Sequence, residues 1–130
     1  MATFQVEVVS AEKKLFSGEA SEVYARSLDG EIGILPGHQP ALLALAISPV
    51  KIHMADGTEV RIAVHNGFLY YKPGDKLVIL ANIAEMADDI DVARATRREA
   101  VLTAQLDKTE DEILAASLKK QMVRLSVAGG

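Results

Sequence analysis

The sequence predicts an antiparallel β domain, a sandwich or a barrel, followed by two amphipathic helices. All four prolines and all six aromatic residues lie at or before Pro73, where short apolar runs are separated by turn signals. Between Gly74 and Gly129 there is no glycine, proline or aromatic residue, and good helix formers dominate. We therefore expect a β domain over residues 1–84 and a helix-turn-helix domain over residues 85–130.

Composition narrows the classes of function. The net charge of −4 argues against a nucleic-acid partner, which would favour a basic face. The absence of cysteine excludes disulfides and thiolate zinc sites. The N-terminus has no basic segment followed by an apolar run, so we expect no signal peptide. The longest uncharged stretch, residues 32–50, contains three prolines and two glycines, so it does not predict a membrane-spanning helix. We expect contact with a membrane only through a partner.

Strands and turns follow from period-two patterns and from Gly, Pro, Asn and Asp pairs. Strands are expected at residues 4–8, 20–27, 31–35, 42–47, 50–54, 60–64, 68–71 and 77–81. Turns are expected at Asp29-Gly30, Pro36-Gly37, Asn66-Gly67 and Pro73-Gly74. The segment from Ala81 to Asp89 has no strong period and is interpreted as a connector.

Register can be predicted for three hairpins. A turn made of Asp56 and Gly57 alone would put the apolar sets of its two strands on opposite faces. A three-residue loop, residues 56–58, avoids this conflict and pairs Met54 with Val60, Ile52 with Ile62 and Val50 with Val64. A two-residue turn at Asn66-Gly67 would pair Val64 with Leu69, and one at Pro73-Gly74 would pair Leu69 with Val78.

The last strands are then apolar on both faces, whereas a sandwich strand normally exposes one polar face to water. One face carries Leu69, Tyr71, Val78 and Leu80, and the other carries Phe68, Tyr70, Leu77 and Ile79. We expect the terminal helices or a partner protein to cover the second face. The alternative is an unusually thick edge of the core.

The first helix is expected to be capped by Asp89 or Asp91 and to end near Leu106. Its expected contact face is small and is interrupted by Arg97, so its burial gains little free energy. That face consists of Ala93, Ala100, Val101 and Ala104.

The second helix is expected to follow a turn at residues 107–109 and to begin with a capping box of Thr109 and Glu112. Helices of about 15 residues are marginal alone in water, so exchange of the pair between two surfaces should be energetically cheap. A fixed helical hairpin that completes the fold is the alternative. The expected apolar stripe is Leu114, Leu118, Met122 or Gln121, and Leu125, flanked by Ile113 and Val123.

Candidate sites are few. The three histidines, His38, His53 and His65, have no metal-ligand spacing and are expected to face the surface or a partner. No catalytic or phosphate-loop motif is present. If the helices pack antiparallel, Arg94 and Arg124 converge on one anion, with Asp91 orienting Arg94 or accepting from an adenine amino group. Ordinary surface pairing between the helices, worth about 0–1 kcal/mol, is the alternative.

Several segments together resemble the epsilon subunit of the rotary F-type ATP synthase. The similarity runs from about Thr3 to Gly129. The block Gly30–Pro40 in its hairpin context is the most specific part. The matching segments are Val8–Glu12, Phe16–Gly18, Gly30–Pro40, Asn66–Leu69, Ile90–Ala95 and Arg124–Val127.

This resemblance implies a β-sandwich of about ten strands, then two helices. It implies a non-catalytic rotor subunit that joins the gamma subunit to the c ring on the cytoplasmic face of the plasma membrane. It further implies that the helices restrain wasteful ATP hydrolysis, and that they reach the alpha/beta catalytic head when extended. The loop carrying Glu31, Gly33 and His38 corresponds to the region facing the c ring.

In nucleotide-binding members of the family, ATP lies between the folded helices. Three departures predict weak or absent ATP binding here: Met86 and Val101 stand where arginine is common, and Lys120 lacks an arginine's fork. Arg97 or Arg98 are candidate substitutes. No cofactor is required, and ATP is expected only as a weak regulatory ligand. The matching positions are Glu85, Ile90, Asp91, Arg94, Ala95 and Arg124.

Two other functions compete with this interpretation. A stand-alone nucleotide-sensing module would become compact with ligand and would need no coiled-coil partner. A β-sandwich enzyme would require a polar cluster that the sequence does not contain.

Overall fold

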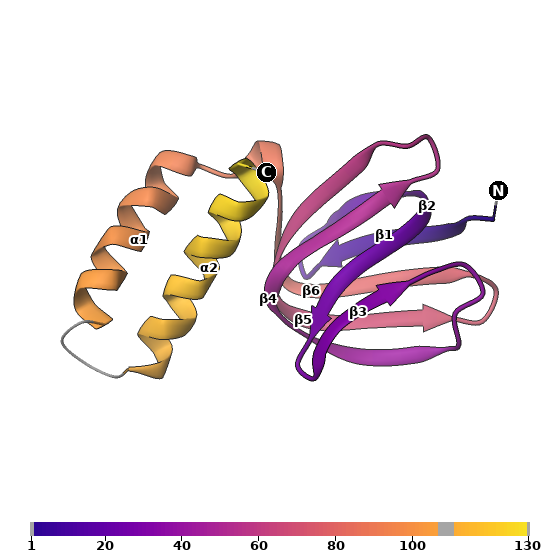
Figure 1. The fold of residues 1–130 in the computed structure, drawn as a ribbon, viewed down its shortest axis with the longest axis horizontal. Coiled ribbons are helices and arrows are strands. Elements are labelled where there is room, and N and C mark those ends of the chain that lie inside the picture. Colours follow the sequence, from indigo (N-terminus) through magenta and orange to yellow (C-terminus); the bar gives the residue numbers. More distant parts are fainter. Residues whose placement is uncertain (1, 107–110, 130) are drawn as a thin grey trace.

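The computed structural model describes residues 2–106 and 111–129, in which six strands form a flattened β-sandwich (Figure 1). The strand order is β1-β6-β5-β4-β2-β3, and a further pairing of β1 with β2 closes the sheet into a barrel-like sandwich. All pairings are antiparallel except β1 with β6. The predicted class is confirmed, with six strands rather than about ten. The strands are β1 (Phe4–Ser10), β2 (Lys14–Ser27), β3 (Gly30–Ile34), β4 (Ala41–Met54), β5 (Glu59–Lys72) and β6 (Lys76–Met86).

The strands are fewer because several predicted breaks are bends inside continuous strands. Pro49 lies within β4, opposite Ala63 of β5. The predicted turn at Asn66-Gly67 is wrong: β5 passes through it, with φ of 65° at Asn66 and 144° at Gly67. These positive φ values exchange the two faces, so both Val64 and Leu69 point into the core instead of pairing with each other.

Two further predictions about strand ends and turns are wrong. The connector expected from Ala81 is strand as far as Met86, so the expected domain boundary after residue 84 falls inside β6. The hairpin between β2 and β3 turns at Leu28 and Asp29, because Ser27 pairs with Gly30. The predicted turn at Asp29-Gly30 is therefore displaced by one residue.

The β4–β5 hairpin has a three-residue loop, as expected, but the loop begins one residue earlier. The Met54 N–H donates to the Thr58 carbonyl at 2.8 Å, which closes residues 55–57 into the loop. Ile52 therefore pairs with Val60, and Val50 with Ile62, so each predicted pair is wrong by two residues. The side of the sheet predicted for each residue of these two strands is still correct, because a shift by an even number of residues does not change the side on which a side chain lies.

The β5–β6 hairpin shows the opposite outcome. Lys72 pairs with Lys76, so residues 73–75 form the loop and Leu69 pairs with Ile79 instead of Val78. This one-residue shift exchanges the faces of β6: Leu77 and Ile79 are fully buried in the sandwich core. The opposite face leaves Phe68 52%, Tyr70 37% and Leu80 50% exposed. These three residues, called the outer apolar face below, are not covered by the helices and are not a core edge.

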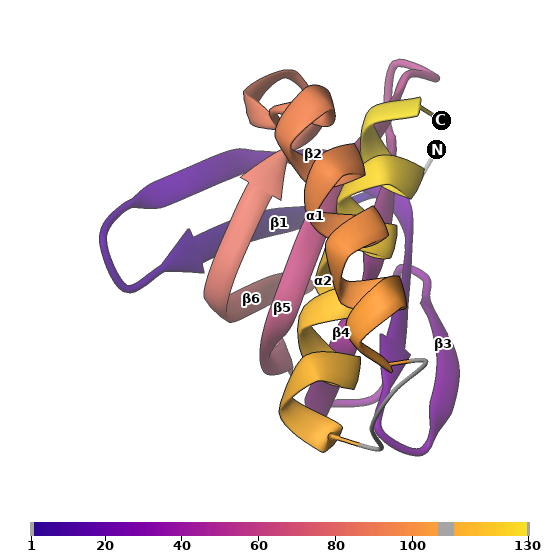
Figure 2. The same cartoon turned by 90° about the vertical axis from the view of Figure 1, so that its left-hand side faces the viewer.

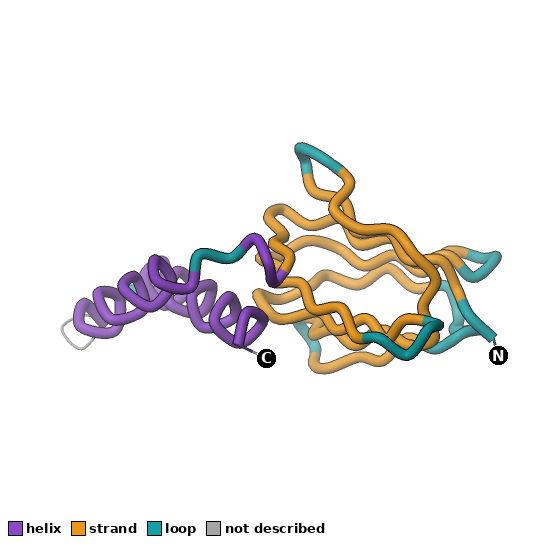
Figure 3. The backbone as a smooth tube through the Cα atoms, turned by 90° about the horizontal axis from the view of Figure 1, so that it is seen from above, coloured by secondary structure: helices purple, strands orange, loops and turns teal. Residues whose placement is uncertain are grey.

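The C-terminal part begins with a short 3-10 turn, η1 (Ala87–Asp89), and continues as α1 (Val92–Leu106) and α2 (Glu112–Gly129). The two helices are antiparallel (Figure 1). α2 packs on β4 and β5, and α1 lies outside it (Figures 2 and 3). Within residues 2–106 and 111–129, no helix is long and apolar enough to cross a membrane.

Aspartates cap both helices. Asp91 Oδ1 accepts from the Arg94 N–H at 2.9 Å, which confirms Asp91 as a predicted cap of α1. Asp111 Oδ1 accepts from the N–H groups of Ile113 (2.8 Å) and Leu114 (3.3 Å) at the start of α2. The predicted turn at residues 107–109 and the Thr109 half of the capping box lie outside the described residues.

The contact faces of the helices differ in part from those predicted. α1 buries Ala95 and Leu102, whereas the predicted face of Ala93, Ala100, Val101 and Ala104 is exposed. In α2 the choice between Gln121 and Met122 is settled, since Gln121 is buried and Met122 is 49% exposed. Val123 and Val127 pack on Ala63 of the sandwich and on Ile90. The helical layer is thus held by few apolar side chains.

The bend in β5 gives a test of the fold. A Cβ on Gly67 would lie 2.2 Å from the Leu80 carbonyl oxygen and 2.8 Å from Ala81 Cα, both backbone atoms. We expect Gly67→Ala to lower the free energy of unfolding by more than about 2 kcal/mol, measured by urea unfolding. Gly57→Ala is the matched control, because it has φ of 91° but no atom within 4 Å; it should cost about 1 kcal/mol. Equal losses in both variants would contradict the close approach.

Candidate functional site

A cavity of about 240 Å³ lies where the start of α1, the end of α2 and the end of β6 meet. Five of the six predicted nucleotide-binding residues line it. Ile90, the sixth, is buried beside the cavity among Ala63, Val123 and Val127. The antiparallel packing of the helices therefore brings Arg94 and Arg124 together, as predicted. The lining residues are Glu85, Asp89, Asp91, Arg94, Ala95, Arg98, Gln121 and Arg124.

Glu85 joins the sandwich to α2. Its Oε1 atom accepts from Arg124 Nε at 2.5 Å and from His65 Nε2 at 3.0 Å. The Glu85 and Arg124 side chains are 26% and 22% exposed, and the His65 side chain is fully buried. The three residues come from β6, α2 and β5, so they connect three elements across the boundary between the two parts of the chain.

The pKa values of this cluster follow from its contacts. Burial alone would raise the pKa of Glu85, but the hydrogen bonds from Arg124 and His65 outweigh it and lower the pKa below its usual value. Burial lowers the pKa of His65, the Glu85 hydrogen bond opposes this shift, and the nearby Arg124 charge adds to it. His65 is therefore neutral at pH 7, and its proton lies on Nε2, because the Glu85 carboxylate only accepts.

His65 is the functional residue that sequence reasoning misplaced. It was expected at the surface or facing a partner, but it is only 2% exposed, and its buried Nδ1 atom has no hydrogen-bond partner among residues 2–106 and 111–129. The pattern along β5 held no signal for this burial, because part of the surroundings of His65 comes from α2, whose Arg124 shares the Glu85 Oε1 atom with it and lies 59 residues further along the chain.

The charges around the cavity balance: three arginines face three acidic side chains. Of the two arginines predicted as substitutes for the missing family arginines, Arg98 lines the cavity and Arg97 does not. Met86 packs against the sandwich core instead of the cavity. Cavities for small ligands usually measure about 300–1,000 Å³, so this one is smaller than most.

The predicted c-ring loop residues are not brought to one place. Glu31 and Gly33 lie on the exposed face of β3, whereas His38 is exposed in the segment after the strand. β3 ends at the end of the sandwich away from the helices (Figure 1). The His38 ring lies 5.6 Å from the Tyr71 ring, measured between centroids. Asp75 holds this loop, because its Oδ1 accepts from the Tyr71 hydroxyl at 2.5 Å and from the Gly37 N–H at 3.1 Å.

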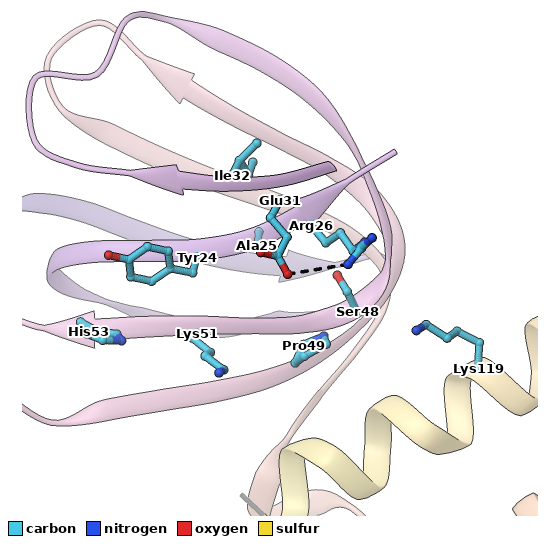
Figure 4. Close-up of a pocket in the computed structure, with 10 residues that line it drawn as sticks. All are labelled: Tyr24, Ala25, Arg26, Glu31, Ile32, Ser48, Pro49, Lys51, His53 and Lys119. Atoms are coloured by element: carbon cyan, nitrogen blue, oxygen red, sulfur yellow. Dashed lines mark ion pairs between the residues drawn. The ribbon is translucent and has the colours of Figure 1, made fainter. Parts of the chain in front are cut away.

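A second cavity of about 450 Å³ opens between the sandwich and α2 (Figure 4). It forms where residues 25–26 of β2 lie opposite residues 46–50 of β4, so the ladder is interrupted around Pro49. The Lys119 side chain extends from α2 toward it, and Arg26 pairs with Glu31 at 3.7 Å (Figure 4). Both partners of that pair are exposed, so it stabilises the fold little.

A family model described as ATP synthase, Delta/Epsilon chain, beta-sandwich domain matches residues 3–87. An ATP synthase epsilon chain of Streptomyces griseus is 44% identical over 124 residues, covering 95% of this chain and 94% of the relative. The chain belongs to the ATP synthase epsilon-chain family. The epsilon chain of Brevibacillus brevis is 41% identical and is covered over 99% of its length. An epsilon chain is a structural, non-catalytic subunit, so that prediction is confirmed.

Solved structures share the fold. A chain in the mitochondrial ATP synthase of Euglena gracilis, in an assembly titled OSCP/F1/c-ring, superposes with a TM-score of 0.74 at 18% identity, covering 99% of this chain and 79% of that chain. A chain from the central stalk and c-ring of the Tetrahymena thermophila enzyme gives a TM-score of 0.58 at 15% identity, covering 68% and 69%. The first match includes the helices as well as the sandwich.

The Arg124–Glu85 contact yields a pH-dependent expectation. Arg124→Gln should lower the free energy of unfolding at pH 7 by about 1–3 kcal/mol, because it leaves Glu85 with His65 as its remaining donor. A carboxyl group whose pKa is lowered on folding stabilises the fold above its ordinary pKa and loses this effect as pH falls. The difference between the two proteins should therefore shrink below about pH 4.5.

Urea unfolding of both proteins from pH 7 to pH 3 measures this difference. Arg97→Gln, on the exposed face of α1, is the matched control and should unfold like the unchanged protein at every pH. A difference that stays constant down to pH 3 would show that Arg124 stabilises the fold through packing alone.

Proposed function

We propose that this epsilon-family chain is a rotor subunit of the ATP synthase central stalk, coupling the gamma subunit to the c ring. The proposal extends to regulation: the helices restrain ATP hydrolysis when they leave the sandwich and extend toward the alpha/beta head. The observation that supports it best is the small interface of α2, which consists of the Arg124–Glu85 contact and one small apolar cluster. The cluster contains Ala63, Ile90, Val123 and Val127, with Ile47, Ala87 and Ala128 partly buried against it. Such an interface can be exchanged for another at low cost.

The outer apolar face supports a protein partner for the sandwich. Phe68, Tyr70 and Leu80 are each more than a third exposed and lie on neighbouring strands, with Phe68 directly opposite Leu80. Exposed apolar clusters of this kind mark interaction surfaces. We assign this face to the gamma subunit, and the loop around His38 to the c ring. The chain then reaches the cytoplasmic face of the membrane only through the complex.

The cavity at Arg94 and Arg124 is the proposed site for ATP. Guanidinium groups suit phosphate oxygens, and a ligand touching both helices and Glu85 would favour the docked helices. The acidic side chains Glu85, Asp89 and Asp91 oppose an anion, and Glu85 already occupies Arg124. We therefore propose that ATP binds weakly and that its affinity falls as the salt concentration rises.

Calorimetric titration of ATP into the isolated chain tests this site. We expect Arg94→Ala and Arg124→Ala each to weaken ATP binding by about 10–100-fold, the loss of one charged hydrogen bond. Arg97→Ala is the control, because Arg97 does not line the cavity, and it should leave the affinity unchanged. Binding that is unaffected by Arg94→Ala would remove the assigned site.

The regulatory part is tested in the assembled enzyme. We expect an ATP synthase whose epsilon chain ends after Asp89 to hydrolyse ATP several-fold faster than the intact complex, because the sandwich still assembles but the helices are missing. The amount of epsilon chain in each purified complex is the control. Equal hydrolysis rates with equal incorporation would contradict inhibition by the helices, and failure to copurify with the complex would favour a stand-alone nucleotide-sensing module.

A further inference from the structure

His65 owes its burial to α2. On the outer side of β5, Ala63 and His65 lie where α2 packs and are 0% and 2% exposed. Further along the same side, where no helix packs, Phe68 and Tyr70 are 52% and 37% exposed. The comparison within one strand shows what would happen to His65 if α2 left the sandwich: its ring would meet water.

The surroundings of the His65 ring are mostly unfavourable to a positive charge. β6 contributes the Glu85 carboxylate, which already accepts from Arg124. α2 contributes two cations, Arg124 and Lys120, that oppose charging of the ring. The residues paired with His65 on β4 and β6 are Ile47 and Ile83, which carry no charge. Asp88 and Asp89 of η1 are exposed to solvent.

The Nδ1 atom of His65 is also an unfavourable site for a proton. Nε2 donates its proton to Glu85, so an added proton must go to Nδ1, which is buried and has no acceptor in the part of the chain that the structure describes. An unsatisfied buried N–H is costly, and it would stand beside a second cation on α2. Release of α2 removes both penalties, since the ring is then hydrated and Arg124 moves away.

We propose that His65 positions Glu85 against Arg124 and acts as a proton-sensitive latch, so that protonation of His65 at Nδ1 releases α2 from the sandwich. The latch concerns the docking of the helices itself. It goes beyond the proposed rotor function and requires neither nucleotide nor another subunit. Lower pH therefore favours the released helices.

The direction and size of the pH effect on docking follow from the difference in the pKa of His65 between the docked and released states. The pKa of His65 is lowered in the docked state by burial, and it returns to its ordinary value near 6.5 when α2 leaves. The released state therefore binds more protons below about pH 6.5, and docking weakens as pH falls through this range. One proton changes the docking equilibrium by at most about tenfold between pH 7.5 and pH 5.5. Protonation of Glu85 would also weaken docking, but only at a pH below the range in which His65 titrates, because the pKa of Glu85 is lowered from its ordinary value.

Docking can be followed in the full chain by fluorescence energy transfer. The chain has no cysteine, so dyes can be placed at Glu12→Cys on the sandwich and Thr103→Cys on α1, both exposed positions. Without nucleotide, we expect the released fraction relative to the docked fraction to rise up to about tenfold from pH 7.5 to pH 5.5. In His65→Gln, whose amide keeps a donor for Glu85 but does not titrate, the ratio should stay constant.

One control variant and one direct measurement complete the test of the latch. His38→Gln, in the exposed loop away from the helices, should show the same pH dependence as the unchanged chain. Proton NMR of the unchanged chain gives the pKa of His65 directly, so the test does not depend on whether a variant folds. A His65 pKa of 6.5 or above in the docked chain, or an identical pH dependence in His65→Gln, would overturn the proposal. Because no other subunit is present, that outcome would leave the rotor function untouched.

Discussion

The contact between the Arg124 guanidinium on α2 and the Glu85 carboxylate on β6 determines how the two parts of the chain meet. It closes one side of the cavity that Arg94 and Arg98 line, and it gives His65 the acceptor that fixes its ring. Breaking a partly buried contact of this kind leaves a charge without its partner, so its loss weakens the docking of α2 on the sandwich. The proposed nucleotide site and the docked position of α2 therefore both depend on this contact.

Apolar side chains are distributed unevenly between the two parts. The sandwich core contains many fully buried residues, among them Val6, Ile52, Ile62 and Ile79. The interface under α2 is much smaller, and burial of one valine gains only about 1.5–3 kcal/mol before the cost of ordering. Meanwhile Phe68, Tyr70 and Leu80 remain open to solvent on the sandwich. The sandwich is thus a stable body with one face free for a partner, and the helices are a lightly attached layer.

The sequence predicted the class of the fold and the ends of the helices better than the strand register. Asn66-Gly67 was interpreted as a hairpin turn because such turns need positive φ, yet the same φ values here bend a continuous strand. β6 gave no clear period after Ala81 because its inward residues change from Leu77, Ile79 and Ala81 to Ala84 and Met86. Local patterns do not contain these shifts, since they depend on which strand lies opposite.

For the candidate site too, some residues could be predicted from the sequence and others depend on distant parts of the chain. Five of its residues were predicted from the sequence: Asp91, Arg94 and Arg124 from the expected antiparallel packing of the helices, and Glu85 and Ala95 only through the resemblance. The structure alone places His65 beside this site and selects Arg98 over Arg97, since the residues around the site come from distant parts of the chain. The contact face of α1 was also misjudged: Ala95 and Leu102 are seven apart and share one face, but the alanines at 93, 100 and 104 formed a longer pattern. Spacing alone does not decide between two such faces.

Native-state amide hydrogen exchange tests most directly whether the helices form a lightly attached layer. Amides of α2 around Val123 and those of core strands around Ile62 would be followed in increasing, non-denaturing amounts of urea. The account predicts that α2 opens at a free energy several kcal/mol below that of the sandwich core, as a separate unit. Opening of both regions at one common free energy, with the same dependence on urea, would contradict it.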